Sequence, residues 1–341
     1  MTDHREAGLR ALFVTHGGPG IGGGHISRCL ALASALGECG YPVSFAVNSG
    51  GVGLLGARAE EAFVSDKLFS SDPAELPGLP EMLDGCAFAV VDSYEASPEW
   101  LAALASCCFL VVIDDLADRP VGPFASVLLN HNLGADRLRY DLAPSSLALL
   151  GPDYALLRPE VSCWSRRLGE GGVLQEEAVF FVAGASDVGG VTERVLGWWQ
   201  PRWPHLKAVV GPLMDGESRF RCRGQAEGKP NVTLLEAPEN FFEEMARSER
   251  VICTSSVTAY EALALRKPLA VFQVASNQEG IGAAIEELHL GRNLGRFGSF
   301  GADEVEAFLD LAPLVPPAVV NPKGAKAAAS ALAAFFERGE R

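Results

Sequence analysis

Short apolar runs alternate with helical patterns along the whole chain. In the first half, runs rich in β-branched and aromatic residues predict strands at 10–15, 41–47, 88–92, 109–114, 126–130 and 147–151. These runs are continuously apolar rather than alternating, which is typical of parallel strands that are covered on both faces. After the first run, the apolar spacing from Ile26 to Leu36 predicts an amphipathic helix.

The alternation breaks once and then restarts. The stretch 159–177 is charged, contains glycine and lacks strong periodicity, so we expect a linker at 161–177. Beyond it the pattern predicts strands at 178–183, 206–210, 231–235, 250–254 and 268–272, and helices near 190–200, 239–248, 256–266 and 279–289. We therefore predict an N-terminal α/β domain at 1–160, a C-terminal α/β domain at 178–320 and a terminal helix at 321–341, with both domains doubly wound around parallel sheets.

Length and composition narrow the function classes. A chain of 341 residues exceeds one ordinary core. The net charge of −15 argues against nucleic acid as a partner. The eight cysteines show neither a C-x-x-C pair nor zinc-ligand spacing, so we expect no metal site. The N-terminus has no apolar signal region, and no run approaches the roughly 20 apolar residues that span a bilayer, so we expect a cytoplasmic protein without membrane insertion.

A glycine-rich stretch, HGGPGIGGGHISR (16–28), follows the first predicted strand. Residues 18–23 satisfy the dinucleotide fingerprint G-x-G-x-x-G, which demands an acidic residue at the end of the second strand to hold a ribose. That strand ends in Asn48-Ser49-Gly50-Gly51, so a nicotinamide cofactor is not expected, nor any other cofactor.

The same stretch presents a histidine at the start of a helix. Glycines 22, 23 and 24 let the backbone approach a ligand closely, so we expect Gly22, Gly23 and Gly24 to bind substrate. His25 then stands at the carboxyl edge of a parallel sheet, where open α/β folds bind ligands, and can accept a proton as a general base. The alternative is a solvated histidine without a role. His16, at the end of the strand, is a weaker candidate and is interpreted as structural.

Further polar residues follow other predicted strands. Asp92 and Tyr94 come after the strand at 88–92 and so reach the same sheet edge. Asp114-Asp115-Leu-Ala-Asp118 is similar to an aspartate-rich metal motif, but a single copy after an apolar strand favours a helix cap or turn.

The second half carries two candidate anion cradles at strand ends. Gly184 and Ser186 lie between a strand and a helix, where free N–H groups bind phosphate. Ser255, Ser256 and Thr258 repeat this arrangement, and the alternative for Ser255 or Ser256 is a plain N-cap. Glu261, in the following helix, is placed to reach a ribose diol. Asn277 and Gln278 close the next strand, again at the carboxyl edge.

Several blocks together carry a family resemblance. GGGHISRCLALA, VVDSY, VVIDDLADR with LLNHN, LLGPDYALLRPE and SSVTAYEALALRKPLAVFQVASNQ occur in this order over roughly residues 10 to 295. They resemble the UDP-sugar hydrolases of the pseudaminic acid pathway, UDP-2,4-diacetamido-2,4,6-trideoxy-β-L-altropyranose hydrolases, within the spore-coat polysaccharide group. That family is similar to the nucleotide-sugar glycosyltransferases of peptidoglycan synthesis, and the resemblance implies a two-domain GT-B fold whose domains face each other across a cleft.

The resemblance implies roles for individual residues. The family's G-x-G-H-x-x-R motif falls on Gly22, Gly24, His25 and Arg28, with the histidine activating water at the sugar C1. Its Asp-x-Tyr block falls on Asp92 and Tyr94, beside the sugar. Its T-x-x-E and N-Q elements fall on Thr258, Glu261, Asn277 and Gln278, facing the UDP. Two departures put side chains where backbone would meet a phosphate: Gly184-Ala185-Ser186-Asp187-Val188 replaces a glycine pair followed by Ser-Asp-Pro, and Ser255-Ser256 replaces a glycine pair.

The function expected from these residues is hydrolysis of a UDP-linked diacetamido sugar with inversion at the anomeric carbon. UDP is a good leaving group, so one base suffices and the paired carboxylates of a glycosidase are not needed. The alternatives are a glycosyltransferase of the same fold, in which an acceptor hydroxyl replaces water, and a sugar-nucleotide sensor without activity.

Overall fold

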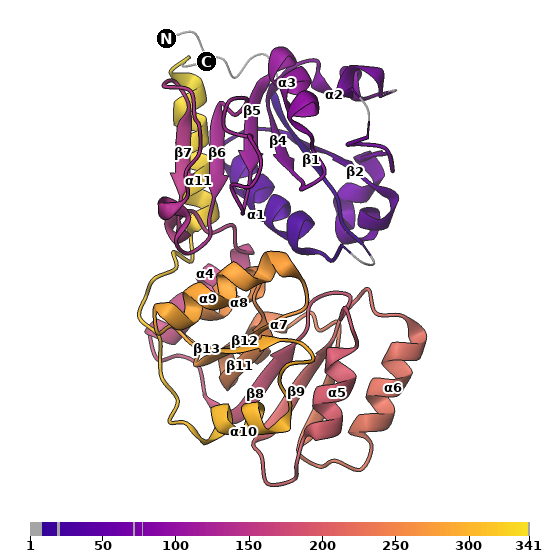
Figure 1. Ribbon diagram of the computed structural model, residues 1–341, viewed down its shortest axis with the longest axis vertical. Coiled ribbons are helices and arrows are strands. Elements are labelled where there is room, and N and C mark those ends of the chain that lie inside the picture. The colour runs from indigo at the N-terminus through magenta and orange to yellow at the C-terminus, as the bar shows by residue number, and fades with distance from the viewer. Residues whose placement is uncertain (1–8, 19–20, 71, 77, 340–341) are drawn as a thin grey trace. The chain divides into compact units, whose positions relative to one another are not determined.

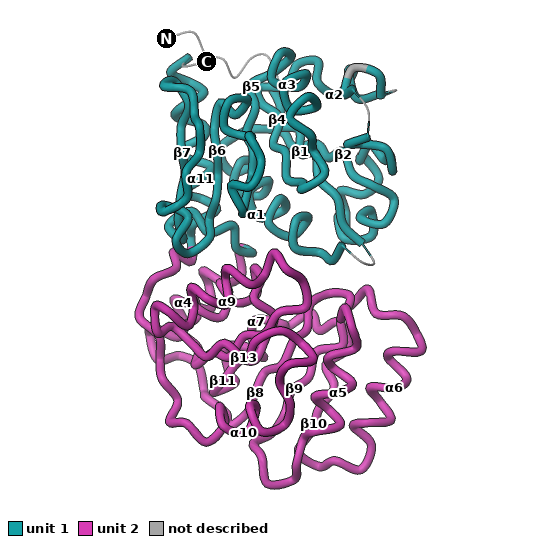
Figure 2. Tube along the Cα trace, in the orientation of Figure 1, with its two compact units in different colours: residues 1–158, 323–341 teal, residues 159–322 magenta. Residues whose placement is uncertain are grey.

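The computed structural model describes residues 9–339, apart from residues 19–20, 71 and 77. The chain divides into two compact units, shown in Figure 2. Unit 1 comprises residues 1–158 and 323–341, and unit 2 comprises residues 159–322. Within the described residues no helix is both long and apolar enough to cross a membrane.

Unit 1 is built on a parallel sheet (Figure 1). Its described strands are β1 (Arg10–Thr15), β2 (Val43–Val47), β3 (Phe63–Val64), β4 (Cys86–Asp92), β5 (Phe109–Ile113), β6 (Val127–Asn130) and β7 (Leu147–Leu150). They lie in the order β3-β2-β1-β4-β5-β6-β7. Successive connections run one way from β1 and the other way from β4, so the topological switch point lies between these two strands.

Helices cover both faces of this sheet. The described α-helices of unit 1 are α1 (Gly24–Glu38), α2 (Leu79–Leu83), α3 (Pro98–Cys107) and α11 (Gly324–Glu337). Phe13 of β1 packs in one cluster with Leu32 of α1 and Leu332 of α11, while Leu12 packs on the opposite face with Trp100 of α3. Because both faces are buried, the strands read as continuous apolar runs.

Unit 2 repeats this architecture. Its described strands are β8 (Glu176–Val182), β9 (His205–Val210), β10 (Val232–Glu236), β11 (Ser248–Thr254), β12 (Leu269–Gln273) and β13 (Arg292–Arg296), parallel and in the order β10-β9-β8-β11-β12-β13. Its described α-helices are α4 (Pro159–Gly169), α5 (Val191–Trp198), α6 (Gly216–Ala226), α7 (Phe241–Arg247), α8 (Val257–Ala264), α9 (Glu279–Glu287) and α10 (Ala302–Asp310). The switch point lies between β8 and β11. The predicted α/β class and parallel sheets are thus confirmed.

The segment expected as a linker is different in the structure. Helix α4 occupies residues 159–169 and packs in unit 2 against α7 and α8, where Ser165 Oγ donates to the carbonyl of Ala264 at 3.0 Å. Pro159 at its start and two arginines in its last turn are ordinary helix signals. The sequence pattern does not predict this helix, because its buried face is narrow: only Val161 is fully buried.

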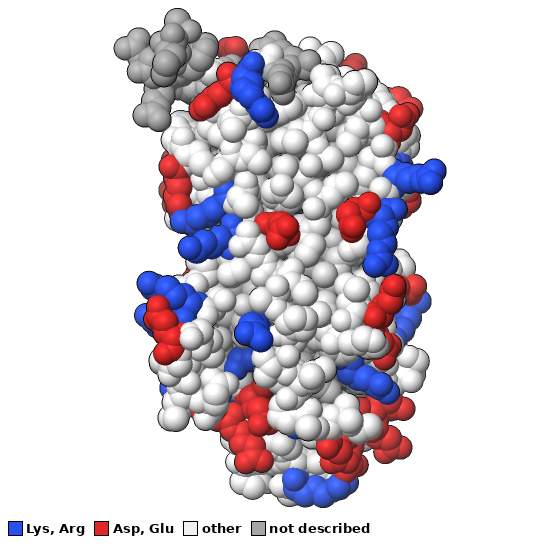
Figure 3. Space-filling view, turned by 90° about the vertical axis from the view of Figure 1, so that its left-hand side faces the viewer, with Lys and Arg blue, Asp and Glu red and all other residues white. Residues whose placement is uncertain are grey.

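The terminal helix belongs to unit 1. Alanines at 325, 328 and 329 are buried against the core, and α11 contacts α1 along the same face of the sheet. Small side chains allow this close approach of the two helices. On the face of the molecule in Figure 3, basic and acidic side chains are interspersed over both units instead of gathering into a basic patch.

Candidate active site

The glycine-rich loop after β1 is held by the residue that follows β2. Asn48 accepts from the Gly17 N–H through Oδ1 at 2.9 Å, and its Nδ2 donates to the Gly17 carbonyl at 2.9 Å. In dinucleotide-binding folds the end of the second strand carries a carboxylate that binds the ribose. In this chain Asn48 occupies that place and holds the loop. Positions 19 and 20 of the fingerprint lie outside the described residues.

Two glycines are needed for the shape of this loop. Gly18 has φ of 123° and a Cβ there would lie 2.7 Å from the Gly50 carbonyl oxygen, while Gly22 has φ of 89°. Their N–H and C=O groups bond to each other at 2.8 and 3.0 Å and close the loop. Gly24 differs, since it begins α1, is exposed, and a Cβ at this position would meet no atom within 4 Å. No side chain caps the N-terminus of α1, where Gly23 is the N-cap.

His25, in the first turn of α1, is held by a buried carboxylate at the end of β4. Its Nδ1 lies 2.7 Å from Asp92 Oδ1. Arg28, one turn later on α1, donates two hydrogen bonds of 2.7 Å to the same carboxylate, from Nε and Nη2. Burial opposes ionisation of Asp92, but the charge of Arg28 and the hydrogen bonds with Arg28 and His25 outweigh it and hold the pKa of this carboxyl well below its usual value.

This ionised carboxylate fixes the tautomer of His25. Asp92 can only accept, so the hydrogen of the neutral imidazole sits on Nδ1 and Nε2 keeps a lone pair. The ring of Tyr94 packs edge-on against His25 with centroids 4.8 Å apart, and the ring of His16 lies 5.1 Å away. His25 is therefore oriented with an acceptor nitrogen, which is the arrangement of a general base.

A second carboxylate, that of Asp115 after β5, also binds Arg28 and fixes its position. Asp115 accepts from Arg28 Nη1 at 2.8 Å, from Asn132 Nδ2 at 2.8 Å and from the Tyr94 hydroxyl at 2.5 Å. Burial again opposes ionisation, and Arg28 lowers the pKa of Asp115 well below its usual value. The strands β1, β4, β5 and β6 thus each contribute to one network at the carboxyl edge of the sheet.

Arg28, which the sequence leads us to expect at the substrate, is bonded to two carboxylates of the protein in the structure. Its side chain is only 6% exposed and its guanidinium is committed to Asp92 and Asp115. In this arrangement Arg28 holds the carboxylate beside His25. The side chain of Asp92 is fully buried and contacts His25 in the same network.

The aspartate-rich motif separates into two roles. Asp114 accepts from the N–H groups of Leu116 and Ala117 and from the Tyr140 hydroxyl, so it closes the loop after β5. Arg119 joins this loop to the one after β4 by donating to the carbonyls of residues 93, 94 and 96. No metal-binding cluster of three or more His, Cys, Asp or Glu side chains occurs in the described parts of the chain.

In unit 2, the helix after β8 already has an anion at its N-terminus. Asp187 accepts from the N–H groups of Val191 and Thr192 at 3.0–3.2 Å. Asp187 adopts φ of 47° and is buried, and burial raises its pKa. The expected cradle at Gly184 and Ser186 therefore faces a helix whose first N–H groups are occupied by the protein's own carboxylate.

The helix after β11 lacks such a cap. The Ser256 hydroxyl bonds to Thr254 Oγ1 at 2.9 Å, and no side chain caps the α8 N-terminus. Ser256 and Thr258 are partly exposed, whereas Glu261 is only 1% exposed. An uncapped helix start with hydroxyls beside it suits an anionic group.

Ser255 is placed differently from the expectation. Its side chain is completely buried, donates to the Phe272 carbonyl at 3.3 Å and accepts from Gln273 Nε2 at 3.0 Å. Gln273 also donates to Asn293 Oδ1 at 2.8 Å. Ser255 thus belongs to a buried network that ties β11, β12 and β13 together, and it supports the α8 N-terminus from behind.

Asn277 and Gln278 lie in a short 3-10 helix, Ser276–Gln278, that leads into α9. Both are partly exposed, and Gln278 Oε1 accepts from the Val274 N–H at 2.9 Å. The structure thus brings them to the carboxyl edge of the unit 2 sheet, after β12, as the sequence predicts.

Sequence reasoning missed the part that several residues play in the network. In the sequence analysis Asn132 occurs only within the LLNHN block and Asp115 only within the aspartate-rich motif. Asn48 occurs only as the residue found where a dinucleotide fold has a carboxylate. The available signal was positional, because all three follow predicted parallel strands closely, and the carboxyl ends of these strands meet at one edge.

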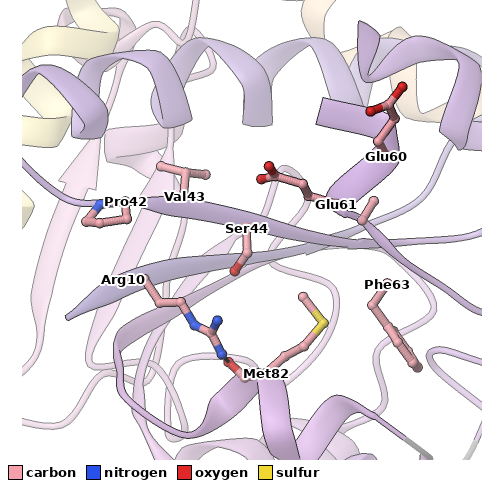
Figure 4. Close-up of a pocket in the computed structure, with 9 residues that line it drawn as sticks. Arg10, Pro42, Val43, Ser44, Glu60, Glu61, Phe63 and Met82 are labelled. Atoms are coloured by element: carbon pink, nitrogen blue, oxygen red, sulfur yellow. Dashed lines mark hydrogen bonds between the residues drawn. The ribbon is translucent and has the colours of Figure 1, made fainter. Parts of the chain in front are cut away.

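A hollow elsewhere in unit 1 takes no part in this site. It is lined by Arg10, Val43 and Phe63 at the amino ends of β1, β2 and β3, and Figure 4 shows Arg10 beside Met82. Arg10 Nη2 donates to the Met82 carbonyl at 2.8 Å. Since the strands are parallel, this hollow lies at the opposite edge of the sheet from His25.

The network also predicts how acid affects stability. His131 is buried beside it, its Nδ1 accepts from the Leu156 N–H at 3.3 Å, and burial together with the charge of Arg28 lowers its pKa to about 4. The unfolded chain takes up this proton near pH 6.5 and the folded chain does not, so stability falls as the pH drops between these values. Between pH 7 and pH 5, proton uptake by His131 in the unfolded chain lowers the free energy of unfolding by on the order of 2 kcal/mol.

The His131→Asn variant isolates this effect, since an amide oxygen can still accept from Leu156 but does not titrate. Urea unfolding at pH 7 and pH 5 should show the wild type losing more stability than the variant by that amount. Equal losses in the two proteins would show that His131 is free to take up a proton in the folded state.

Comparison with known proteins gives a likeness in structure but none in sequence. No protein-family model matches the chain, and no curated protein sequence matches it. MurG from Acinetobacter baumannii superposes with a TM-score of 0.58 at 12% identity, covering 96% of this chain and 99% of that one. The calicheamicin glycosyltransferase CalG4 gives 0.58 at 13% identity, covering 97% and 99%.

A UDP-GlcNAc 2-epimerase from Methanocaldococcus jannaschii, solved with UDP-GlcNAc and UDP, gives a TM-score of 0.59 at 11% identity, covering 95% of this chain and 99% of that one. Identities this low carry the fold alone. Together with the two parallel sheets and their strand orders, they establish that this chain has a GT-B-like fold of two doubly wound α/β units.

Proposed function

We propose that this protein is an enzyme that hydrolyses a UDP-linked diacetamido-trideoxy sugar at its anomeric carbon, with inversion, releasing UDP and free sugar for biosynthesis of a pseudaminic-type acid. The observation that carries the proposal is the position of His25, whose Nδ1 lies 2.7 Å from Asp92 Oδ1. In a neutral imidazole held this way the lone pair is on Nε2. The sequence blocks that resemble the pseudaminic-pathway hydrolases include this histidine.

The chemistry needs little else from unit 1. Water gives a proton to His25 Nε2 while its oxygen attacks C1, and the C1–O bond to the diphosphate breaks with its electron pair leaving on UDP. Asp92 stabilises the imidazolium that forms, and Arg28 keeps Asp92 ionised. Tyr94 packs on the imidazole beside the sugar. Attack from the face opposite the leaving group inverts C1.

We assign UDP to unit 2. The uncapped α8 N-terminus, with Ser256 and Thr258, suits the diphosphate because unpaired N–H groups and the helix dipole favour negative charge there. Glu261 is proposed to bind the ribose, and Gly184, Ser186, Asn277 and Gln278 the rest of the nucleotide. The epimerase of the same fold, solved with UDP-GlcNAc and UDP, supports a UDP-sugar as the ligand.

A glycosyltransferase is the second candidate, since MurG and CalG4 have the same fold. In that enzyme an acceptor hydroxyl would give its proton to His25 in place of water. Release of UDP and free sugar from a panel of UDP-diacetamido sugars, without added acceptor, favours hydrolysis. UDP release only when an acceptor alcohol is added would favour transfer.

Replacing His25 by asparagine should remove the base and keep the bond to Asp92, because the asparagine amide can still donate. Turnover of the hydrolysed sugar should fall by about 10²–10⁴, the usual contribution of a positioned base. Calorimetry should show unchanged UDP affinity, and Ser27→Ala on the same helix is the control. A folded His25→Asn protein with nearly wild-type turnover would rule out this mechanism.

Replacing Gly24 by alanine tests whether the open space at the start of α1 is for substrate. The change meets no protein atom and favours the helix, so thermal stability should stay equal or rise by about 0.4–1 kcal/mol while turnover falls. Gly37→Ala is the matched control, because Gly37 is also exposed in α1 with nothing within 4 Å. Full turnover in both variants would remove Gly24 from the site.

Replacing Glu261 by alanine should weaken UDP binding by about 1–3 kcal/mol through loss of a charged hydrogen bond. Glu261→Gln, which keeps the side chain's size in this buried position, separates the charge from packing. Glu217→Ala, on an exposed residue of α6, serves as the control. Calorimetry that finds wild-type affinity in both Glu261 variants contradicts the assignment.

A further inference from the structure

His16, interpreted from the sequence as structural, lies directly beside the proposed base. It follows β1, is 5% exposed, and its ring centroid is 5.1 Å from that of His25. Its Nε2 is buried and finds no hydrogen-bond partner among the described residues. A buried polar atom of this kind is costly to leave unpaired, which favours binding of a group that can satisfy it.

In both imidazoles Nδ1 faces a carboxylate. His16 Nδ1 lies 3.7 Å from Glu95 Oε1, as His25 Nδ1 lies 2.7 Å from Asp92 Oδ1. Both carboxylates belong to one short segment, residues 92–95, at the end of β4. The contact of 2.7 Å favours a hydrogen on Nδ1 of a neutral His25, and the carboxylate of Glu95, although too distant for a hydrogen bond, favours the same tautomer of His16 through its charge.

His16 is also held neutral and in place. Burial lowers its pKa, and so does the neighbouring His25, while Glu95 and Asp92 oppose the shift. Its ring packs edge-on against Phe69 at 5.4 Å, as His25 packs against Tyr94 at 4.8 Å. The lowered pKa favours a neutral His16 at neutral pH, with its ring fixed beside that of His25.

Two neighbouring acceptors match one water molecule. Water carries two O–H groups and can donate one to each of two neighbouring acceptors. The rings of His16 and His25 are neighbours, with centroids 5.1 Å apart. An alcohol carries one O–H group. If it donates to His25, the buried acceptor of His16 stays unpaired.

We propose that His16 and His25 hold the attacking water together, by one hydrogen each, and that His16 thereby selects water over an alcohol as the nucleophile. This rests on the proposed function, in which His25 is the base. His25 Nε2 takes one proton as the water oxygen bonds to C1 and the diphosphate leaves with its electron pair. The second O–H group, donated to His16, becomes the hydroxyl of the released sugar, so His16 gains no proton.

Two variants of His16 test this selection. His16→Phe keeps a ring against Phe69 and His25 but has no acceptor, and His16→Gln keeps an acceptor. The UDP-sugar that the wild type hydrolyses is incubated in water containing methanol, and free sugar and methyl glycoside are both measured. Calorimetric UDP affinity and thermal unfolding check that each variant is intact.

We expect His16→Phe to lose about 10- to 100-fold in hydrolysis, the usual effect of an unpaired buried group, and to raise the ratio of methyl glycoside to free sugar by a similar factor. His16→Gln should recover most of the hydrolysis. A wild-type product ratio in a folded His16→Phe protein, or an unchanged rate of hydrolysis, would overturn the proposal.

The tautomers give a readout that does not depend on activity. Long-range ¹H–¹⁵N NMR of the ligand-free protein at neutral pH should show hydrogen on Nδ1 and a lone pair on Nε2 in both rings. An Nε2–H tautomer or a charged ring at His16 overturns this inference and leaves the proposed function standing. Failure of the wild type to release UDP from every sugar overturns the proposed function, and the water-selecting step with it.

Discussion

The site depends on one buried charge, the carboxylate of Asp92. A buried ionised group is strongly unfavourable unless it is paired and fully hydrogen-bonded, and removing one partner of such a pair typically costs about 3–5 kcal/mol. Arg28 supplies the pairing with two bonds, and His25 supplies a third. Asp115 accepts from the other side of Arg28 and is itself held by Asn132 and Tyr94. The orientation of His25 follows from this chain of hydrogen bonds.

The fold explains why these residues meet. Connections leave β1 and β4 in opposite directions, so no crossover covers the space at their carboxyl ends. The residues after β1, β4, β5 and β6 converge there, although they are far apart in the chain. The same topology in unit 2 places the residues after β8, β11 and β12 at one edge, where Asp187 occupies one helix N-terminus and leaves the α8 N-terminus uncapped.

The charged groups of the site are paired within the protein, and this determines what remains for a ligand. Arg28 lies between Asp92 and Asp115, one positive charge for two carboxylates, and these side chains organise the site through their contacts with one another. What the network holds in place is an imidazole, His25, beside a glycine-lined helix start. A site of this kind suits proton removal from a small neutral nucleophile better than recognition of a charged group, and it is consistent with assigning the diphosphate to unit 2.

The sequence by itself determined the α/β class, most of the strands and the candidate base, because continuous apolar runs and a glycine loop before a helical pattern are local signals. It missed α4, whose buried face is a single residue wide, and the short strands β3 and β13. Tertiary structure alone decided which polar residues pair. It paired Arg28 with Asp92 and Asp115, placed Ser255 in a buried network, gave Asn48 a role in the loop and set His16 beside His25. Such pairings depend on strand order and register, which bring together residues that no local pattern connects.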